Sequence, residues 1–111
     1  MSSDASTGQS ILEPQWTKHG RRMWHNDRRN DVHDRDRDRG WHESVPVDYP
    51  SAYDGARGRY HADGDCVLIV KFDVTPCGIQ PFVITVLNLR DRPVEEQAYV
   101  RAQAQFGGGS A

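Results

Sequence analysis

The sequence is poor in apolar residues and in cysteine, and it has no long hydrophobic run. Of its 111 residues 36% are hydrophobic and two are cysteine, and no stretch approaches the roughly 20 apolar residues that a membrane-spanning helix needs. The N-terminus lacks the basic and apolar segments of a signal peptide. We therefore expect a cytoplasmic protein with no membrane partner. In a reducing compartment Cys66 and Cys77 are expected to stay free thiols rather than to form a disulfide.

The sequence also has no large excess of positive or negative charge. The formal net charge is −2, which argues against a protein that simply coats nucleic acid. The distribution is uneven, however, because within residues 15–42 eight basic residues stand against five acidic ones, with four histidines among them. Almost all of this local positive charge is arginine, the residue best suited to forked phosphate contacts and to stacking on bases.

A chain of this length can build one small core. Residues 1–14 begin with small polar residues without periodicity and are expected to be disordered, and residues 107–111 have the Gly/Ser composition of a flexible tail. The single domain should span residues 15–106. Within it, residues 31–55 are charged and contain prolines, which indicates a connection rather than a core element.

The first regular element should be a helix over residues 17–30, capped by Thr17. Its basic side chains recur at helical spacing and would form a ridge on one face: Lys18, Arg22, His25 and Arg29. The Asp/Arg alternation of residues 31–39 fits either a solvated extension of the helix or a self-neutralised loop. Gly40 is expected to stop the helix.

The second half of the chain changes to strand periodicity. Residues 57–62 alternate in polarity, and the following Asp-Gly pair at 63–64 favours a hairpin. Residues 66–74 are almost continuously apolar, as in a central strand covered on both faces. Residues 82–89 give a third, β-branched strand.

A proline and acidic residues after Asp91 indicate a C-terminal helix. Its expected apolar stripe is Val94, Ala98, Ala102 and Phe106. The predicted fold class is thus α+β, with an N-terminal helix, a three-stranded antiparallel meander and a C-terminal helix. The strand residues expected in the core are Val67, Leu68, Ile69, Val70, Phe72, Val83, Ile84, Val86, Leu87 and Leu89.

No metal or cofactor site is expected. Asp34, Asp36 and Asp38 imitate the start of a calcium loop, but Arg39 stands where that loop needs glycine. The two cysteines are not a CxxC pair. The short spacing of zinc ligands is also missing from the N-terminal histidines His19, His25, His33 and His42.

What remains is a basic surface that contains histidine. The first helix and one face of the first strand would supply it: Lys18, His19, Arg22, His25, Arg29, Arg57, Arg59 and His61. Such a surface suits RNA cleavage through attack of a 2′-hydroxyl, which needs proton transfer near neutral pH and fixed positive charge on the phosphorane. His19 is the expected proton acceptor, and His61, on the strand face of Arg59, its partner. The alternative is that the arginines are solvated and the histidines incidental.

Three short pieces of the sequence resemble the RelE-like and colicin-D-like ribonuclease toxins. They are His19-x-x-Arg22-Met23 on an early helix, Arg59-Tyr60 opening a meander, and Val83-Ile-Thr-Val86 on its last strand, and the similarity extends over residues 16–90. The resemblance implies a metal-independent RNA-cleaving site of His19, Arg22, Arg59 and Thr85. It also implies an antitoxin-like protein partner. The resemblance is also compatible with a domain of this fold that has lost its activity.

The leading hypothesis is therefore a small ribonuclease-like or RNA-binding toxin domain, active or inactive, with Lys18, His25, Arg29 and Arg57 as additional RNA contacts. The competing hypothesis is a non-enzymatic interaction protein, such as a phage or accessory factor. It would use Trp16, Trp24 and Trp41 with neighbouring arginines as hot spots, since both residue types are enriched in protein interfaces.

Overall fold

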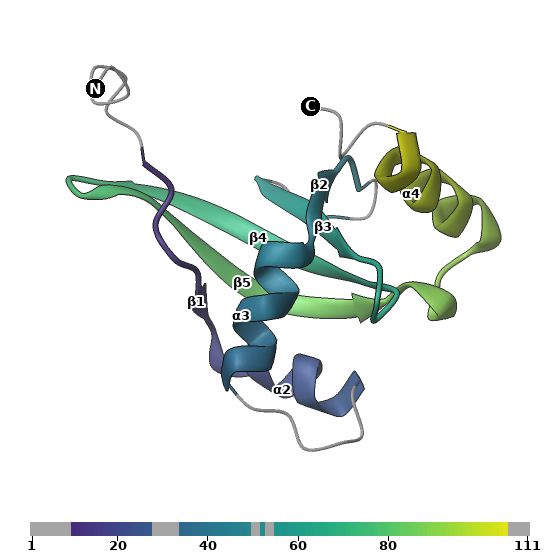
Figure 1. Ribbon diagram of the computed structural model, residues 1–111, viewed down its shortest axis with the longest axis horizontal. Helices are drawn as coiled ribbons and strands as arrows, with labels where there is room; N and C mark the ends of the chain where they lie inside the picture. Colours follow the sequence, from purple (N-terminus) through teal and green to yellow (C-terminus); the bar gives the residue numbers. More distant parts are fainter. Residues whose placement is uncertain (1–9, 28–33, 50–51, 53–54, 107–111) are drawn as a thin grey trace.

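The computed structural model describes residues 10–27, 34–49, 52 and 55–106. They form a five-stranded sheet with two helices on one face and a third on the other (Figure 1). Within those ranges no helix combines the length and the apolar character that crossing a membrane requires. The elements are β1 (Gln15–Trp16), α2 (Lys18–Asp27), α3 (Asp34–Glu43), β2 (Val45–Val47), β3 (Ala56–His61), β4 (Cys66–Thr75), β5 (Gly78–Asn88), the 3₁₀ turn η1 (Leu89–Asp91) and α4 (Val94–Phe106). The α+β class is as predicted.

The sheet is larger than the predicted meander. Its order is β1-β5-β4-β3-β2, in which β3, β4 and β5 form the expected antiparallel meander with β4 in the centre. However, β1 adds to β5 in parallel and β2 adds to the outer edge of β3, so the prediction of a purely antiparallel, three-stranded sheet is wrong. Both added strands are too short to show periodicity. Pro46 is tolerated in β2 because an edge strand leaves one side of its backbone unpaired.

Of two helix boundaries predicted in the N-terminal part, the start at Thr17 is confirmed and the end at Gly40 is wrong. Thr17 caps α2 as predicted, since its Oγ1 accepts a hydrogen bond from the Gly20 N–H at 2.9 Å. Gly40 does not stop a helix but lies inside α3, which continues to Glu43. A Cβ at position 40 would lie 2.4 Å from Trp24 Cη2, so this glycine lets α3 approach α2.

Both faces of β4 are buried over residues 66–70, as predicted for the central strand, whereas residues 71–74 are exposed. Val67 and Ile69 face α4, whereas Leu68 and Val70 face α2 and α3. The predicted core residues that are buried are Val67, Leu68, Ile69, Val70, Val83, Val86 and Leu89. Ile84 and Leu87 are partly buried and pack against the cluster on the α4 side.

Two predictions about burial are wrong. Phe72 is 41% exposed because β4 and β5 continue as a hairpin beyond the end of β3, whose last pairing with β4 is Ala56 with Lys71. The apolar stripe expected on α4 faces solvent: Val94 and Phe106 are both 75% exposed, and Ala98 and Ala102 are exposed as well. The helix turns Val100 to the core instead.

The segment before β1 runs beside β5. Ile79 N–H donates to the Ser10 carbonyl at 2.7 Å, and Leu12 N–H donates to the Ile79 carbonyl at 2.9 Å. Residues 10–14 are therefore part of the described fold, although their composition groups them with the N-terminal tail. As expected, Cys66 and Cys77 form no disulfide with each other: Cys66 is buried at one end of β4, and Cys77 is exposed in the turn after its other end.

Candidate functional site

The outer side of α2 carries a cluster of basic side chains. The inner side is fixed by Gly20, where a Cβ would lie 2.3 Å from the Val83 carbonyl oxygen, and by Trp24, which is 2% exposed. The α2 side chains that are turned away from β5 and from the core cluster around Trp24 are exposed. The exposed basic residues of α2, called here the α2 basic face, are Lys18, His19, Arg21, Arg22 and His25.

α3 contributes a cation beside this face. The guanidinium of Arg37 lies 5.9 Å from the centre of the Trp16 ring, and its Nη1 is 3.0 Å from His25 Nε2. Arginine has only donors, so His25 Nε2 is the acceptor of this bond. Of the two histidines on α2, His25 is thus hydrogen-bonded to Arg37, and His19 is not.

The side chain of Arg59, on β3, binds the C-terminal end of α3. Its Nε donates to Ser44 Oγ at 2.7 Å, its Nη2 donates to the Ser44 carbonyl at 2.7 Å, and its guanidinium lies 4.4 Å from the centre of the Trp41 ring. Burial lowers the pKa of Arg59 from its usual value. The guanidinium therefore satisfies polar groups at the C-terminal end of α3, where a helix leaves carbonyls without internal partners.

His61 lies two residues further along the same face of β3. It is 6% exposed, its ring centroid is 5.7 Å from that of Trp24, and its Nδ1 is 4.0 Å from Glu43 Oε1. Glu43 and Asp63 place carboxylate oxygens close enough to His61 for the three side chains to hold a metal ion. Sequence spacing did not indicate this group, because Glu43 comes from a different element.

Thr85 lies on the other side of the sheet. It is paired with Ile69, whose side chain belongs to the cluster under α4, whereas Arg59 is paired with Leu68 of the cluster under α2 and α3. A β-bulge between Ile69 and Val70 puts Thr85 and Val83 on opposite faces, because Ile84 is an extra residue between the pairs Ile69–Thr85 and Val70–Val83. Thr85 is 4% exposed, and the sheet separates it from Arg59.

The predicted catalytic residues thus fall into three places. The α2 residues His19 and Arg22 lie together on the surface, with Lys18 and His25 beside them. Arg59 and His61 lie under α3, and Thr85 lies under α4. Arg57 is exposed on β3, and Arg29 lies outside the described residues.

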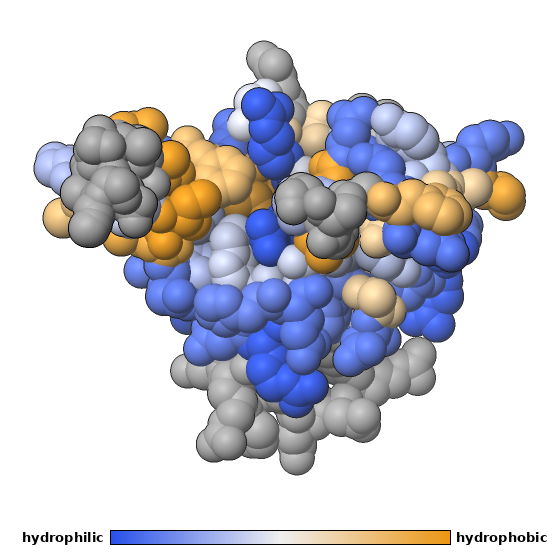
Figure 2. Space-filling view, turned by 45° about the horizontal axis from the view of Figure 1, so that its top comes forward, coloured by the Kyte–Doolittle hydropathy of each residue, from blue (hydrophilic) through white to orange (hydrophobic). Residues whose placement is uncertain are grey.

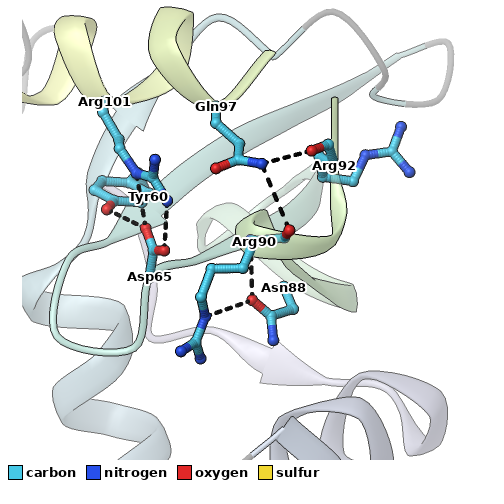
Figure 3. Close-up of polar contacts among 7 residues, drawn as sticks. All are labelled: Tyr60, Asp65, Asn88, Arg90, Arg92, Gln97 and Arg101. Carbon is cyan, nitrogen blue, oxygen red and sulfur yellow. Dashed lines mark hydrogen bonds and ion pairs between the residues drawn. The ribbon is translucent and has the colours of Figure 1, made fainter. Parts of the chain in front are cut away.

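A second polar network, which the sequence did not indicate, joins the β3–β4 turn to α4 (Figure 3). Asp65, in the turn, accepts a hydrogen bond from Tyr60 at 2.6 Å and two from Arg101, the shorter also at 2.6 Å. Arg101 and Tyr60 hold the pKa of Asp65 below its usual value, and burial raises the pKa of Tyr60. Asp65 has a φ of 52°, a conformation that aspartate and asparagine adopt more readily than most residues. The network is therefore structural, since it ties α4 to the β3–β4 turn.

Comparison with protein families gives one match, to the family described as "Putative RelE superfamily toxin domain", over residues 16–90. The chain belongs to this family. The matched segment of the toxin domain runs from β1 through α2, α3 and the whole meander into η1, and it leaves α4 outside. It confirms the resemblance drawn from His19, Arg22, Arg59 and the last strand. Comparison with curated proteins and with solved structures gives no significant match.

Proposed function

We propose that this toxin domain binds RNA through the α2 basic face and cleaves it without a metal ion. The observation that carries the proposal is the concentration of exposed basic side chains on one side of a helix whose only acidic residue is its last, Asp27. Fixed cations at this density neutralise phosphates and supply most of the affinity for nucleic acid. Membership of the toxin family supports RNA as the target by analogy.

His19 is the proposed proton acceptor. In the reaction the 2′-oxygen of one nucleotide attacks the adjacent phosphorus, its proton passes to His19, and the bond from phosphorus to the 5′-oxygen breaks to leave a 2′,3′-cyclic phosphate. The 5′-oxygen takes a proton from water, because the other histidine considered, His61, is buried beneath α3. Arg22, three residues after His19 on the same helix, is the proposed cation that stabilises the charge on phosphorus.

The test is incubation of purified protein with RNA in EDTA, followed by analysis of the product ends. Cleavage that persists in EDTA and leaves 2′,3′-cyclic phosphates is expected, with activity at least about a hundredfold lower in His19→Gln. Lys71→Gln is the matched control, because Lys71 is an exposed cation on the β4–β5 hairpin, away from α2. A requirement for added metal, or full activity in His19→Gln, would contradict the mechanism.

An antitoxin-like partner is the second part of the proposal. Ile11, Phe72 and Val74 are exposed apolar side chains at the hairpin end of the molecule, where Ile11 and Val74 both pair with Ile79. Figure 2 shows an orange, hydrophobic area on the surface. Beyond Lys71, β4 pairs with β5 alone among the described residues, so its other edge has backbone groups for a further strand. We infer that the partner adds an extended apolar segment there, and that Val74→Asp should abolish co-purification with it.

The interaction-module hypothesis has less support. Trp24 and Trp41 are 2% and 6% exposed, and both pack in the chain's own core between α2, α3 and the sheet. Side chains buried in this way are not accessible to a partner as interface hot spots.

A further inference from the structure

One imidazole and two carboxylates meet where α3 ends beside the β3–β4 turn. Glu43 is the last residue of α3, His61 is the last residue of β3, and Asp63 lies in the turn that follows. One ligand atom from each side chain lies within 4.8 Å of the other two. The three residues come from three segments, so the fold, and not one local sequence motif, brings them together.

The imidazole is the fixed member of the group. His61 is 6% exposed and is flanked by the Trp24 ring, which limits its movement. Its Nδ1 faces Glu43 Oε1 at 4.0 Å, while Glu43 Oε2 is 3.5 Å from Arg39 Nε. The two oxygens of Glu43 thus have different neighbours, and Oε1 is the one directed to the histidine.

The carboxylates are the adjustable members. Both Glu43 and Asp63 are exposed, so each can rotate without disturbing the core, and an ion can reach them from solvent. Ligand atoms of a tetrahedral zinc site lie about 2.0–2.2 Å from the metal and therefore roughly 3.3 Å from one another. Side-chain rotations that move the carboxylate oxygens of Glu43 and Asp63 by about 1 Å would bring the three ligand atoms close to that spacing.

We propose that Glu43, His61 and Asp63 bind one divalent transition-metal ion of the Zn²⁺ type. A nitrogen ligand with two carboxylate oxygens suits zinc, whereas Mg²⁺ favours oxygen ligands alone and gives up its water reluctantly. Three protein ligands leave one coordination position for water. The bound ion would join the end of α3 to the β3–β4 turn and stabilise the folded chain, because only the fold assembles the three ligands.

This site is independent of the proposed RNA chemistry. None of its residues belongs to the α2 basic face, and the ion would serve as a structural clamp and take no part in cleavage. Cleavage in EDTA, by protein that circular dichroism shows to be folded there, tests the proposed function, whereas metal binding by the RNA-free protein tests the clamp. Failure of one therefore leaves the other standing.

The experiment is a calorimetric titration of chelator-treated protein with Zn²⁺, with Mg²⁺ as the comparison ion. One Zn²⁺ per chain is expected, together with a higher melting temperature in its presence. The Glu43→Gln, Asp63→Asn double variant should bind Zn²⁺ at least about a hundredfold more weakly, since even loss of a group that only supports a ligand costs about 10- to 100-fold. The matched control, Asp38→Asn with Glu95→Gln, removes two exposed carboxylates from α3 and α4 outside the group and should leave the affinity unchanged.

The imidazole is tested in the unaltered chain, because replacing a buried histidine can unfold it. Zn²⁺ should shift the NMR signals of the His61 ring and leave those of His19 and His42 in place. Equal Zn²⁺ affinity in the double variant and its control, absence of saturable binding, or shifts at His42 in place of His61 would each overturn the proposal.

Discussion

Gly40 of α3 lies against the indole ring of Trp24 in α2, so close that a Cβ at position 40 would come within 2.4 Å of Trp24 Cη2. The same indole packs edge-on to Trp16, at 5.5 Å between ring centroids. Trp24 is therefore the centre of the contact that holds both N-terminal helices on the sheet. The absence of a side chain at position 40 is a condition of that contact.

Gly40→Ala should destabilise the protein by about 1–3 kcal/mol, the usual cost of overpacking a well-filled core. Alanine favours a helix interior over glycine by about 1 kcal/mol, which acts in the opposite direction. The free energy of unfolding in urea measures the balance. Asp38→Ala, an exposed change in the same helix, is the control. A Gly40→Ala variant as stable as the parent would show that the indole can move aside.

Ile69→Ala and Phe72→Ala should differ sharply although both residues lie on β4. Ile69 is 1% exposed in the cluster under α4, so its truncation should cost about 2–5 kcal/mol. Phe72 is 41% exposed on the protruding hairpin, and its truncation should cost less than about 1 kcal/mol. Urea denaturation of the two variants checks this order. Equal losses would mean that the hairpin is packed more tightly than its exposure indicates.

Arg59→Lys should lower stability by about 1.5–3 kcal/mol. Lysine cannot reproduce the paired donation from Nε and Nη2 to Ser44, and a hydrogen bond to a charged donor is worth about that amount. Arg57→Lys is the matched control, because Arg57 is exposed on the same strand, and it should change stability by less than about 0.5 kcal/mol. Unaltered stability of Arg59→Lys, with loss of RNA cleavage alone, would favour a catalytic role for Arg59 over an anchoring one.

Sequence periodicity predicted the elements that carry their own signal. The runs in β4 and β5 are rich in β-branched residues, and Thr17 has the side chain that a helix N-cap requires. The sequence did not predict β1 and β2, because strands of two or three residues form only through pairing with a neighbouring strand. The prediction of which side of α4 faces the core was wrong because the inner side of this helix is partly polar. Gln103, for example, accepts a hydrogen bond from the backbone N–H of Asp48 and donates one to its carbonyl.

The candidate site divides in the same way. The α2 basic face follows from helical spacing and is therefore visible in the sequence. The engagement of Arg59 by Ser44 joins residues 15 positions apart, and no local pattern indicates it. The side of the sheet on which Thr85 lies depends on a β-bulge, which reverses the alternation expected from Val83.

Asp65→Asn should destabilise the fold at neutral pH and have a smaller effect in acid. Asparagine tolerates the positive φ of this turn, so the change removes chiefly the charge that Arg101 binds. The pKa of Asp65 lies below its ordinary 3.8 in the folded chain. A carboxyl with a lowered folded pKa stabilises the fold above its unfolded pKa and loses that contribution as the pH falls through the folded value.

Urea midpoints at about pH 7 and about pH 3 measure this difference. Asp73→Asn, an exposed carboxylate on the hairpin, is the control and should have little effect at either pH. A gap between Asp65→Asn and the parent that is as large in acid as at neutral pH would show that the lost contribution is not the charge.

RNA affinity should depend on salt through the α2 basic face. Each phosphate contact adds nearly one unit to the slope of log K against log salt, about 0.7 for a single strand. Arg22→Gln should therefore weaken binding to RNAs of different sequence by similar factors and reduce the slope by about that amount. Lys71→Gln removes one exposed cation from the hairpin and leaves the net charge equal to that of Arg22→Gln, so it separates a local contact from a change in overall charge. Binding isotherms over a series of salt concentrations give both quantities. If the two variants reduce the slope equally, RNA responds to the total charge and not to α2; if neither does, the binding surface lies elsewhere, and exposed Arg57 on β3 becomes the next cation to replace.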